Sequence, residues 1–242
     1  MEKTALENKT LAMIVRDEEN NPAGGINRNL PILLPHVQEA VVVDTGSKDK
    51  TSNILKRLQR KFPHLRTYER QFDGFSSSRN YSLSQVRTKM ALVLDADELL
   101  TAEDFEILVD FVKKNPYNRY NFYFDCLYPS GTVEKSCMPG VWATRLFDTI
   151  GSEFKTSNPH RDYFENIGYE EEILKAPFAP VNIKHFLPPH EIIKMLDWYN
   201  GNTFLTEQPL KNAKEYGWKE FNGWRRLFGN GENNIDYDSF RR

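Results

Sequence analysis

The sequence predicts an α/β fold built on a doubly wound, mostly parallel sheet with helices on both of its faces. The apolar run at residues 91–94 is rich in Leu and Val and is typical of a strand buried on both sides, as strands inside parallel sheets are. From residue 11 to residue 115, short apolar runs alternate with segments of helical periodicity. Carboxylates directly follow three of the predicted strands, which places polar groups at one edge of the sheet.

Length and composition limit the class of protein. The chain has 242 residues, of which 39% are hydrophobic and 13% aromatic, so it can bury a sizeable core and is not a disordered chain. Its formal charge of −2 gives no basic surface for extended nucleic-acid binding. We therefore expect one folded domain over residues 1–242 and no nucleic-acid partner.

The first half of the chain is expected to alternate strictly between strands and helices. Pro31 and Pro35 limit the first helix, and Ser47 or Asp49 is a natural N-cap for the second. Right-handed crossovers then make the strands parallel. The expected strands are residues 11–16, 38–43, 65–69 and 91–94. The expected helices are 26–37, a helix that begins after Ser47 or Asp49 and ends near residue 61, 75–86 and 102–115.

The pattern changes after residue 115. Residues 119–128 alternate and are rich in aromatic side chains, and residues 141–147 and 181–186 also indicate strands, which predicts a mixed antiparallel edge. A helix is expected at 190–200. The tail, residues 201–242, is expected to be helical, with an aromatic face formed by Trp218 and its neighbours that either packs on the domain or contacts a membrane surface. We expect residues 10–115 and 116–200 to form two halves of one domain.

Three features of the sequence bear on location. No apolar run is long enough to span a bilayer, and the polar N-terminus shows no signal peptide. Cys126 and Cys137 could face each other across a hairpin, although free buried thiols are favoured. These features predict a cytoplasmic protein, with peripheral membrane contact through the tail left open.

The acidic segment after residue 94 is the strongest chemical signal. Strand alternation would place Asp95 and Asp97 on the same side, with Glu98 beside them. Two ionised carboxylates at one spot favour a divalent cation that also contacts substrate phosphates. An isolated D-x-D is equally typical of a capped strand end, so the other strand ends decide between the two interpretations.

Two further strand ends carry carboxylates. Residues 17–20 follow the first strand, and Asp44 ends the second, where α/β nucleotide sites hold a ribose or base. For Asp44 alone, capping of the turn at residues 45–47 explains the residue as well as a ligand contact does.

Taken together, these segments resemble glycosyltransferase family 2. The resemblance rests on Asp44-Thr45-Gly46-Ser47, Ser78-Arg79-Asn80 and Asp95-Ala96-Asp97-Glu98, in this order, together with the first strand and turn at residues 13–19. It covers roughly residues 10–115.

The resemblance implies a GT-A fold, a nucleotide-sugar donor and Mn²⁺ or Mg²⁺ as the cofactor. Asp97 would be the most direct metal ligand, with Asp95 and His185 as further candidates. The residues implied in nucleotide binding are Val15, Arg16, Glu18, Asp44, Gly46, Ser47, Arg79, Asp95 and Ala96.

The general base is expected from the second half of the chain. Members with a similar acidic motif often carry an Arg-hydrophobic-Phe strand, matched by residues 145–147, then a His-Glu pair and a late His, which His185 could match. The chain departs at the middle element, where we expect Glu171, with Glu170 and Glu172 as alternatives, to be the base. A run of glutamates is equally typical of a solvated loop, and His185 between apolar residues is also typical of a structural histidine.

The predicted function is metal-dependent, inverting transfer of a sugar from a nucleotide diphosphate, most simply UDP, to a hydroxyl group. The acceptor would be a glycan, a lipid-linked molecule or a protein. The alternatives are a non-catalytic module that binds the nucleotide, and a phosphohydrolase of the HAD type, against which Glu98 after the second Asp counts.

Overall fold

The structure is a computed structural model that describes residues 5–19, 21, 25–127, 133–134, 142–156, 165–167 and 175–186. The expected helix at 190–200, the tail at 201–242 and Glu170, Glu171 and Glu172 lie outside the described residues. The expected division of the domain near residue 115 stays a prediction.

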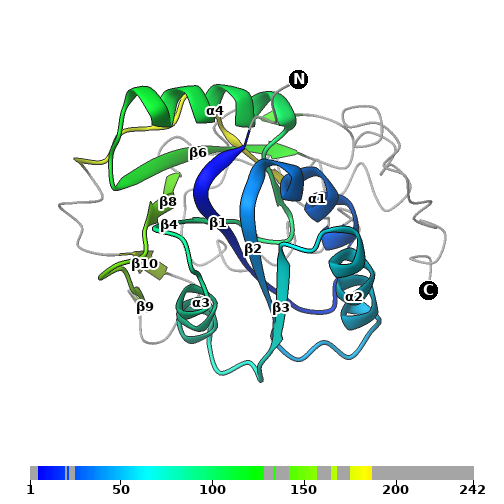
Figure 1. Ribbon diagram of the computed structural model, residues 1–242. Coiled ribbons are helices and arrows are strands. Elements are labelled where there is room, and N and C mark those ends of the chain that lie inside the picture. Colours follow the sequence, from blue (N-terminus) through cyan, green and yellow to red (C-terminus); the bar gives the residue numbers. More distant parts are fainter. Residues whose placement is uncertain are drawn as a thin grey trace.

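The first half of the chain alternates between strands and helices as predicted (Figure 1). Its elements are β1 (Leu6–Val15), α1 (Gly25–Leu33), the 3₁₀ turn η1 (Leu34–His36), β2 (Val37–Asp44), α2 (Thr51–Lys61), β3 (Leu65–Glu69), α3 (Phe75–Ser84), β4 (Met90–Val93), β5 (Glu98–Leu99) and α4 (Ala102–Lys114). The second half contributes β6 (Arg119–Leu127), β7 (Val133–Glu134), β8 (Trp142–Asp148), β9 (Phe154–Thr156), β10 (Glu165–Ile167) and β11 (Ile183–Phe186).

Among the described residues, a nine-stranded sheet forms the centre of the molecule, in the order β3-β2-β1-β4-β8-β6-β11-β5, with β7 paired to β6. The strands β3, β2, β1 and β4 are parallel, and β8 runs antiparallel to both of its neighbours. The mixed edge predicted from the aromatic alternation is therefore confirmed. β9 and β10 form a separate two-stranded sheet.

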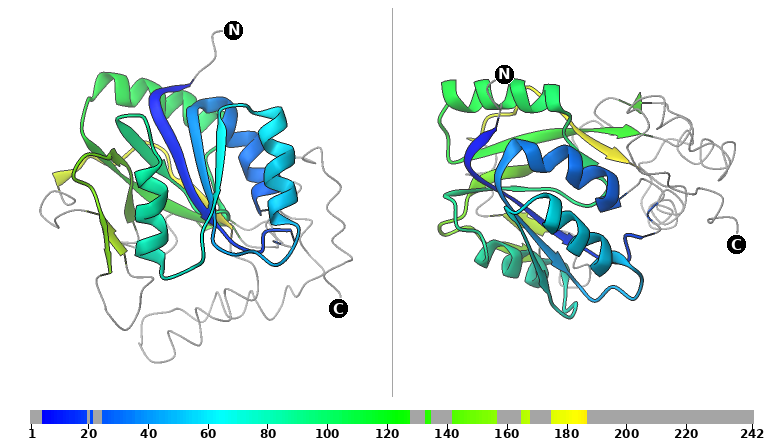
Figure 2. Two further views of the ribbon diagram at one scale, coloured as in Figure 1. Left: turned by 60° about the horizontal axis from the view of Figure 1, so that its bottom comes forward. Right: turned by 45° about the vertical axis from the view of Figure 1, so that its right-hand side comes forward.

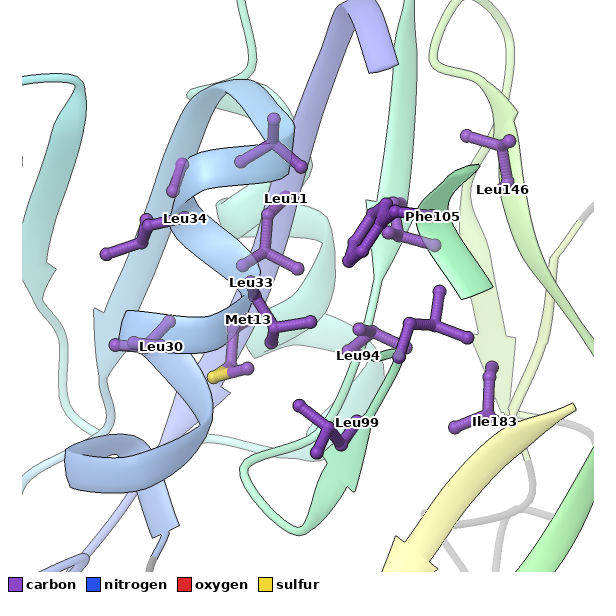
Figure 3. Close-up of a cluster of buried hydrophobic side chains, with 14 of the residues drawn as sticks. Leu11, Met13, Leu30, Leu33, Leu34, Leu94, Leu99, Phe105, Leu146 and Ile183 are labelled. Atoms are coloured by element: carbon purple, nitrogen blue, oxygen red, sulfur yellow. The ribbon is translucent and has the colours of Figure 1, made fainter. Parts of the chain in front are cut away.

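Both faces of the parallel strands are buried, as the Leu- and Val-rich runs indicated. Leu11 and Met13 of β1 belong to the larger core, which α1, α2 and α4 cover. Figure 3 shows Leu30 and Leu33 of α1 lying against Met13. Ala12, which points the other way, belongs to a smaller core that includes residues of α3, β8 and β9.

The smaller core is closed from the side of α3. The two-stranded sheet of β9 and β10 lies beside that helix (Figures 1 and 2). Asn80 of α3 fixes this contact, since its amide donates to the carbonyl of Phe154 at 2.9 Å and its carbonyl accepts from the Phe154 N–H at 2.8 Å. The side chain of Asn80 thereby makes the two backbone hydrogen bonds that a further neighbouring strand would make with Phe154.

Two local predictions were wrong. The N-cap of α2 is Lys50 and makes no side-chain capping bond; Asp49 instead accepts from the backbone and hydroxyl of Thr51, and Ser47 bonds to another loop. Cys126 is disulfide-bonded, so a free thiol is excluded for it, while Cys137 lies outside the described residues.

None of the described helices is long and apolar enough to cross a membrane. The cytoplasmic location and a membrane contact through the tail stay predictions.

The short strand β11 is held from two sides. It lies between β6, which runs parallel, and β5, which runs antiparallel. The ammonium group of Lys184 reaches both carboxylate oxygens of Asp104 in α4, at 2.7 and 2.6 Å. Asp104 also closes the capping box with Thr101 at the start of α4. This largely buried ion pair therefore joins β11 to the helix and fixes the position of the next residue, His185.

We expect Lys184→Met to lower the free energy of unfolding by about 2–4 kcal/mol, because the largely buried carboxyl group of Asp104 would lose its cationic partner. Urea denaturation measures the change. Lys114→Met is the matched control, since Lys114 pairs with Asp110 on the exposed side of α4 and should change stability by less than about 0.5 kcal/mol. Equal effects of the two substitutions would show that the Lys184 pair does not hold β11.

Candidate active site

The polar residues predicted for the site gather where β1, β2 and β4 end. The register pairs Val15 with Asp44, so these two strands end side by side. β4 also lies next to β1 and runs in the same direction. The carboxyl ends of parallel strands form one edge of a sheet, which is where open α/β sheets bind ligands.

The loops after β1 and β2 are tied to each other by reciprocal hydrogen bonds. The backbone N–H of Asp17 donates to the Ser47 hydroxyl at 2.9 Å, and Asp17 accepts from the backbone of Lys48 at 2.7 Å. The N–H of Glu18 donates to the buried Thr51 hydroxyl at 2.7 Å. Side chains of each loop thus accept hydrogen bonds from backbone N–H groups of the other. We call these two joined loops, residues 16–19 and 45–51, the rigid wall of the site.

The same loops continue this pairing one residue further along. The N–H of Glu19 donates to Asp49 at 2.8 Å, and Lys50 donates to Glu19 through both its backbone and its ammonium group. Asp17 adopts a left-handed φ of 54°, which aspartate tolerates better than most residues do. Residues held in such conformations gather at binding sites.

Two glycines shape the loops for different reasons. Gly25 has a φ of +44°, and a Cβ there would lie 2.4 Å from the Glu18 carboxylate and 2.8 Å from the Cβ of Asn21, so another residue would be strained there. Gly46 has a φ of +98°, and a Cβ there would meet nothing within 4 Å. The space beside Gly46 is therefore open among the described residues, next to Asp44.

Asp44 caps the turn after β2, as the alternative interpretation proposed. Its Oδ1 accepts from the N–H groups of Gly46 and Ser47 at 3.1 and 2.8 Å. Its Oδ2 accepts no hydrogen bond from the described residues. One oxygen thus holds the turn and the other is left for a donor group of a ligand, so the two interpretations are compatible.

Asp95 is bound by two arginines. Arg79 donates to both of its carboxylate oxygens, at 2.7 and 3.2 Å, and Arg145 reaches Oδ2 at 3.4 Å. Burial alone would raise the pKa of Asp95, but the charges of Arg79 and Arg145 outweigh it and hold that pKa well below its usual range. Asp95 is ionised, and its charge is balanced inside the protein.

Glu98 is the most deeply buried carboxylate of the acidic segment, with 3% of its side chain exposed. Its Oε2 accepts from the backbone N–H of Asp95 at 2.9 Å, and its Oε1 accepts from Arg145 at 2.5 Å. Burial and the neighbouring Asp95 charge raise the pKa of Glu98 to about 7, against the opposing charge of Arg145. Glu98 therefore closes the turn through contacts with Asp95 and Arg145.

Asp97 and His185 face each other on the other side of this turn. The distance from His185 Nε2 to Asp97 Oδ2 is 3.3 Å, and the Asp97 carbonyl accepts from the N–H of Phe186 at 2.9 Å. The expectation that strand alternation joins Asp95 and Asp97 was wrong, because β4 ends at Val93 and both residues lie in the turn after it. They have different partners.

The pair formed by Asp97 and His185 fits a divalent ion. Neighbouring ligand atoms of an octahedral ion with bonds of 2.0–2.1 Å are about 3 Å apart, close to the observed 3.3 Å. The described residues contain no group of three or more His, Cys, Asp or Glu that could hold a metal, so substrate or water oxygens would complete the shell. Asp95, tied to two arginines, is the weaker candidate.

Three other predicted residues are placed at the same edge. Val15 accepts from the Thr45 N–H at 2.9 Å, and the carbonyl of Ala96 accepts from Asn29 of α1 at 2.6 Å. The side chain of Arg16 is half-exposed, next to Asp17 and Phe72. Arg16 is thus accessible to a ligand, whereas Val15 and Ala96 shape the backbone.

Sequence reasoning missed two contributors. Asn29 is fully buried in α1 and holds the acidic turn through the carbonyls of Ala96 and Glu98. β5 pairs with β11 and places Glu98 opposite His185. A two-residue strand has no recognisable period, whereas the polar Asn29 on an otherwise apolar helix face was a visible signal.

Comparison with known proteins agrees with this geometry. A sequence model of the family described as "Glycosyl transferase family 2" matches residues 34–176. A TPR repeat-containing protein of Synechococcus elongatus is 37% identical over 99 residues, which cover 41% of this chain and 23% of that protein. The chain thus matches less than a quarter of the length of this relative.

Solved structures of TarS from S. aureus share the fold. The structure of TarS 1–349 has a TM-score of 0.55 and 16% identity, and the match covers 91% of this chain and 72% of that one. The complex of TarS 1–349 with UDP-GlcNAc has a TM-score of 0.52 and 14% identity, covering 91% and 73% of the two chains. The complex with UDP gives a TM-score of 0.53 at 15% identity, with 86% and 70% covered.

The hydrogen bond from the Glu18 N–H to the Thr51 hydroxyl allows a test of whether side chains join the loops after β1 and β2. We expect Thr51→Val to lower the free energy of unfolding by about 1–3 kcal/mol, because the buried N–H of Glu18 loses its acceptor while the shape is kept. Urea denaturation is the measurement. Thr51→Ser keeps the hydroxyl and serves as the control, with a loss below about 1 kcal/mol. If valine and serine behave alike, the hydroxyl does not join the loops.

Proposed function

The chain belongs to glycosyl transferase family 2, and on this basis we propose that it transfers a sugar from a nucleotide diphosphate sugar to a hydroxyl acceptor, with inversion and with a divalent metal. The observation that carries the proposal is the acidic turn after β4, in which Asp97 and His185 face each other while arginines neutralise Asp95. In this arrangement Asp97 and His185 would both serve as ligands of a cation, at the edge of the sheet where β2 ends in Asp44.

We assign different roles in donor binding and metal binding to the residues of the site. Asp44 Oδ2 accepts from the base or ribose, in the open space beside Gly46. Asp97 and His185 would hold Mn²⁺ or Mg²⁺. When bound, the ion would supply positive charge for the diphosphate that leaves. Arg79 fixes Asp95 and adds positive charge near the phosphates.

The donor is proposed to be a UDP-sugar. TarS, which has the same GT-A fold, was solved with UDP and with UDP-GlcNAc, and this supports a nucleotide of that kind here. The acceptor is proposed to be a hydroxyl of a glycan, a lipid-linked molecule or a protein. Glu171, with Glu170 and Glu172 as alternatives, stays the predicted general base and lies outside the described residues.

A non-catalytic nucleotide-binding module is the second candidate, because the glutamate segment departs from the pattern of similar members. The phosphohydrolase alternative is excluded by the family. The glycosyltransferase and the non-catalytic module would both bind a nucleotide, but only the glycosyltransferase would release UDP from a UDP-sugar.

We expect Asp97→Asn to lower kcat/KM for UDP release from a UDP-sugar by at least about 100-fold, because the metal loses its charged ligand. The melting temperature should change by less than about 3 °C, since Asp97 is partly exposed and its carbonyl bond to Phe186 is kept. A coupled UDP-release assay with Mn²⁺ measures the effect. Excess EDTA should abolish wild-type activity, and the exposed variant Asp110→Asn is the control.

The outcomes separate the candidates. Wild-type protein that is stabilised by UDP with Mn²⁺ in a thermal-shift screen but releases no UDP from many UDP-sugars would favour the binding module. Full activity of Asp97→Asn, or full activity in EDTA, would reject the metal-dependent mechanism.

Asp44→Asn separates turn capping from ligand binding. The asparagine carbonyl can still accept from Gly46 and Ser47, but the free oxygen becomes an amide donor. We expect the KM for the donor to rise about tenfold, with the melting temperature unchanged within about 2 °C. Steady-state kinetics measures this, and Asp44→Ala, which also loses the cap, should melt lower. If the KM of Asp44→Asn equals that of the wild-type protein, Asp44 caps the turn and does not bind the donor.

A further inference from the structure

A β-bulge places Arg145 in the site. The register of β6 and β8 pairs Tyr120 with Leu146 and the next residue, Asn121, with Thr144, so Arg145 is the extra residue of β8. Bulges redirect a side chain and interrupt regular pairing, and they are frequent next to active sites. Here the guanidinium group reaches Glu98 at 2.5 Å and Asp95 at 3.4 Å, with 13% of the side chain exposed.

Glu98 holds the main chain of the acidic turn. Its side chain accepts from the N–H of Asp95 at 2.9 Å, and its own N–H donates to the carbonyl of Asp95 at 3.0 Å. Asp97 lies between these two residues in the sequence, so the bonds fix the chain on both sides of it. Any shift of Glu98 would move Asp97 relative to His185.

Two arginines face two carboxyl groups at this turn. Arg79 and Arg145 contact Asp95 and Glu98, which brings two guanidinium groups and two carboxyl groups into one largely buried cluster. Arg79 alone satisfies both oxygens of Asp95, so the main partner of Arg145 is Glu98. The Arg145–Glu98 ion pair can thus be removed while the Arg79–Asp95 ion pair keeps its own contacts.

We infer that Arg145 and Glu98 are positioning residues, which act through the turn from Asp95 to Glu98 and hold Asp97 where it meets the metal. The inference rests on the proposed function, because it concerns the metal-dependent step. It predicts that loss of the pair weakens metal use even when the protein remains stably folded.

The test compares Arg145→Met with the double variant Glu98→Met/Arg145→Met. The single variant leaves Glu98 buried without its cation and should melt about 10 °C lower, whereas the double variant leaves no uncompensated charge and should melt above the single variant. Both variants should need about tenfold more Mn²⁺ for half-maximal UDP release and show a kcat reduced about tenfold. The amide of Asp95 should exchange hydrogen at least about tenfold faster in the double variant, because its acceptor is gone.

A matched pair elsewhere in the sheet is the control. Arg66 of β3 contacts Glu39 of β2 at 2.5 Å, with 19% and 13% of the side chains exposed, far from the strand ends that form the site. The variants Arg66→Met and Glu39→Met/Arg66→Met should lose stability but keep kcat and the Mn²⁺ requirement within about twofold.

The outcomes are distinguishable. A double Glu98/Arg145 variant with wild-type kcat, Mn²⁺ requirement and Asp95 exchange overturns the positioning role and leaves a pair that only stabilises the fold. The positioning role is equally overturned if the control pair changes the Mn²⁺ requirement to the same extent. Absence of Mn²⁺-dependent UDP release in the wild-type protein rejects the proposed function instead, and hydrogen exchange then still decides whether the pair holds the turn.

Discussion

The ion pairs between two arginines and the carboxylates that follow β4 are the interactions on which the site depends. A carboxylate buried without a cation is costly, and two adjacent ones are costlier still. Arg79 comes from α3, Arg145 from β8 and the carboxylates from the turn after β4. The arginines meet these carboxyl groups only when all three segments are in place, so the fold and the charge arrangement require each other.

The two acidic residues of the D-x-D segment therefore have different tasks. Asp95 is bound by two arginines, whereas the side chain of Asp97 contacts His185 in the described part of the chain. The turn makes this division possible: in a continued strand both side chains would point the same way and compete for the same counter-charge. The end of β4 at Val93 therefore allows the two carboxylates to have different partners.

The sequence predicted the parallel half of the fold well, because its signals were local. β3 was predicted at its observed bounds, and the predicted end of α2 at residue 61 agrees with the structure. The apolar residues of β4 contribute to both cores, and Ala40 and Val42 of β2 belong to the larger one. Periodicity and breaker residues such as Pro63 and Pro116 determine these boundaries before any tertiary contact forms.

The site was predictable in its residue types but not in its partners. The sequence identified Asp44, Arg79, Asp97 and His185, yet not which of them would meet. Pairing of β11 with β5 depends on contacts between residues far apart in the chain, and so does the bulge that turns Arg145 inward. A bulge leaves no periodic signal when it consists of a single extra residue in an apolar strand.

Asp44 shows how these levels combine. From the sequence, turn capping and ligand binding competed as explanations for one carboxylate. The carboxylate has two oxygens, and in the structure the N–H groups of Gly46 and Ser47 donate to only one of them, Oδ1. The bonds to Oδ1 fix the direction in which Oδ2 points, so the structural role orients the ligand-facing oxygen. The same logic applies to the acidic turn, where bonds made by Glu98 to the backbone hold the chain that carries Asp97. In this protein the residues that satisfy the backbone at the strand ends also set the directions of the groups that we propose to contact the donor and the metal.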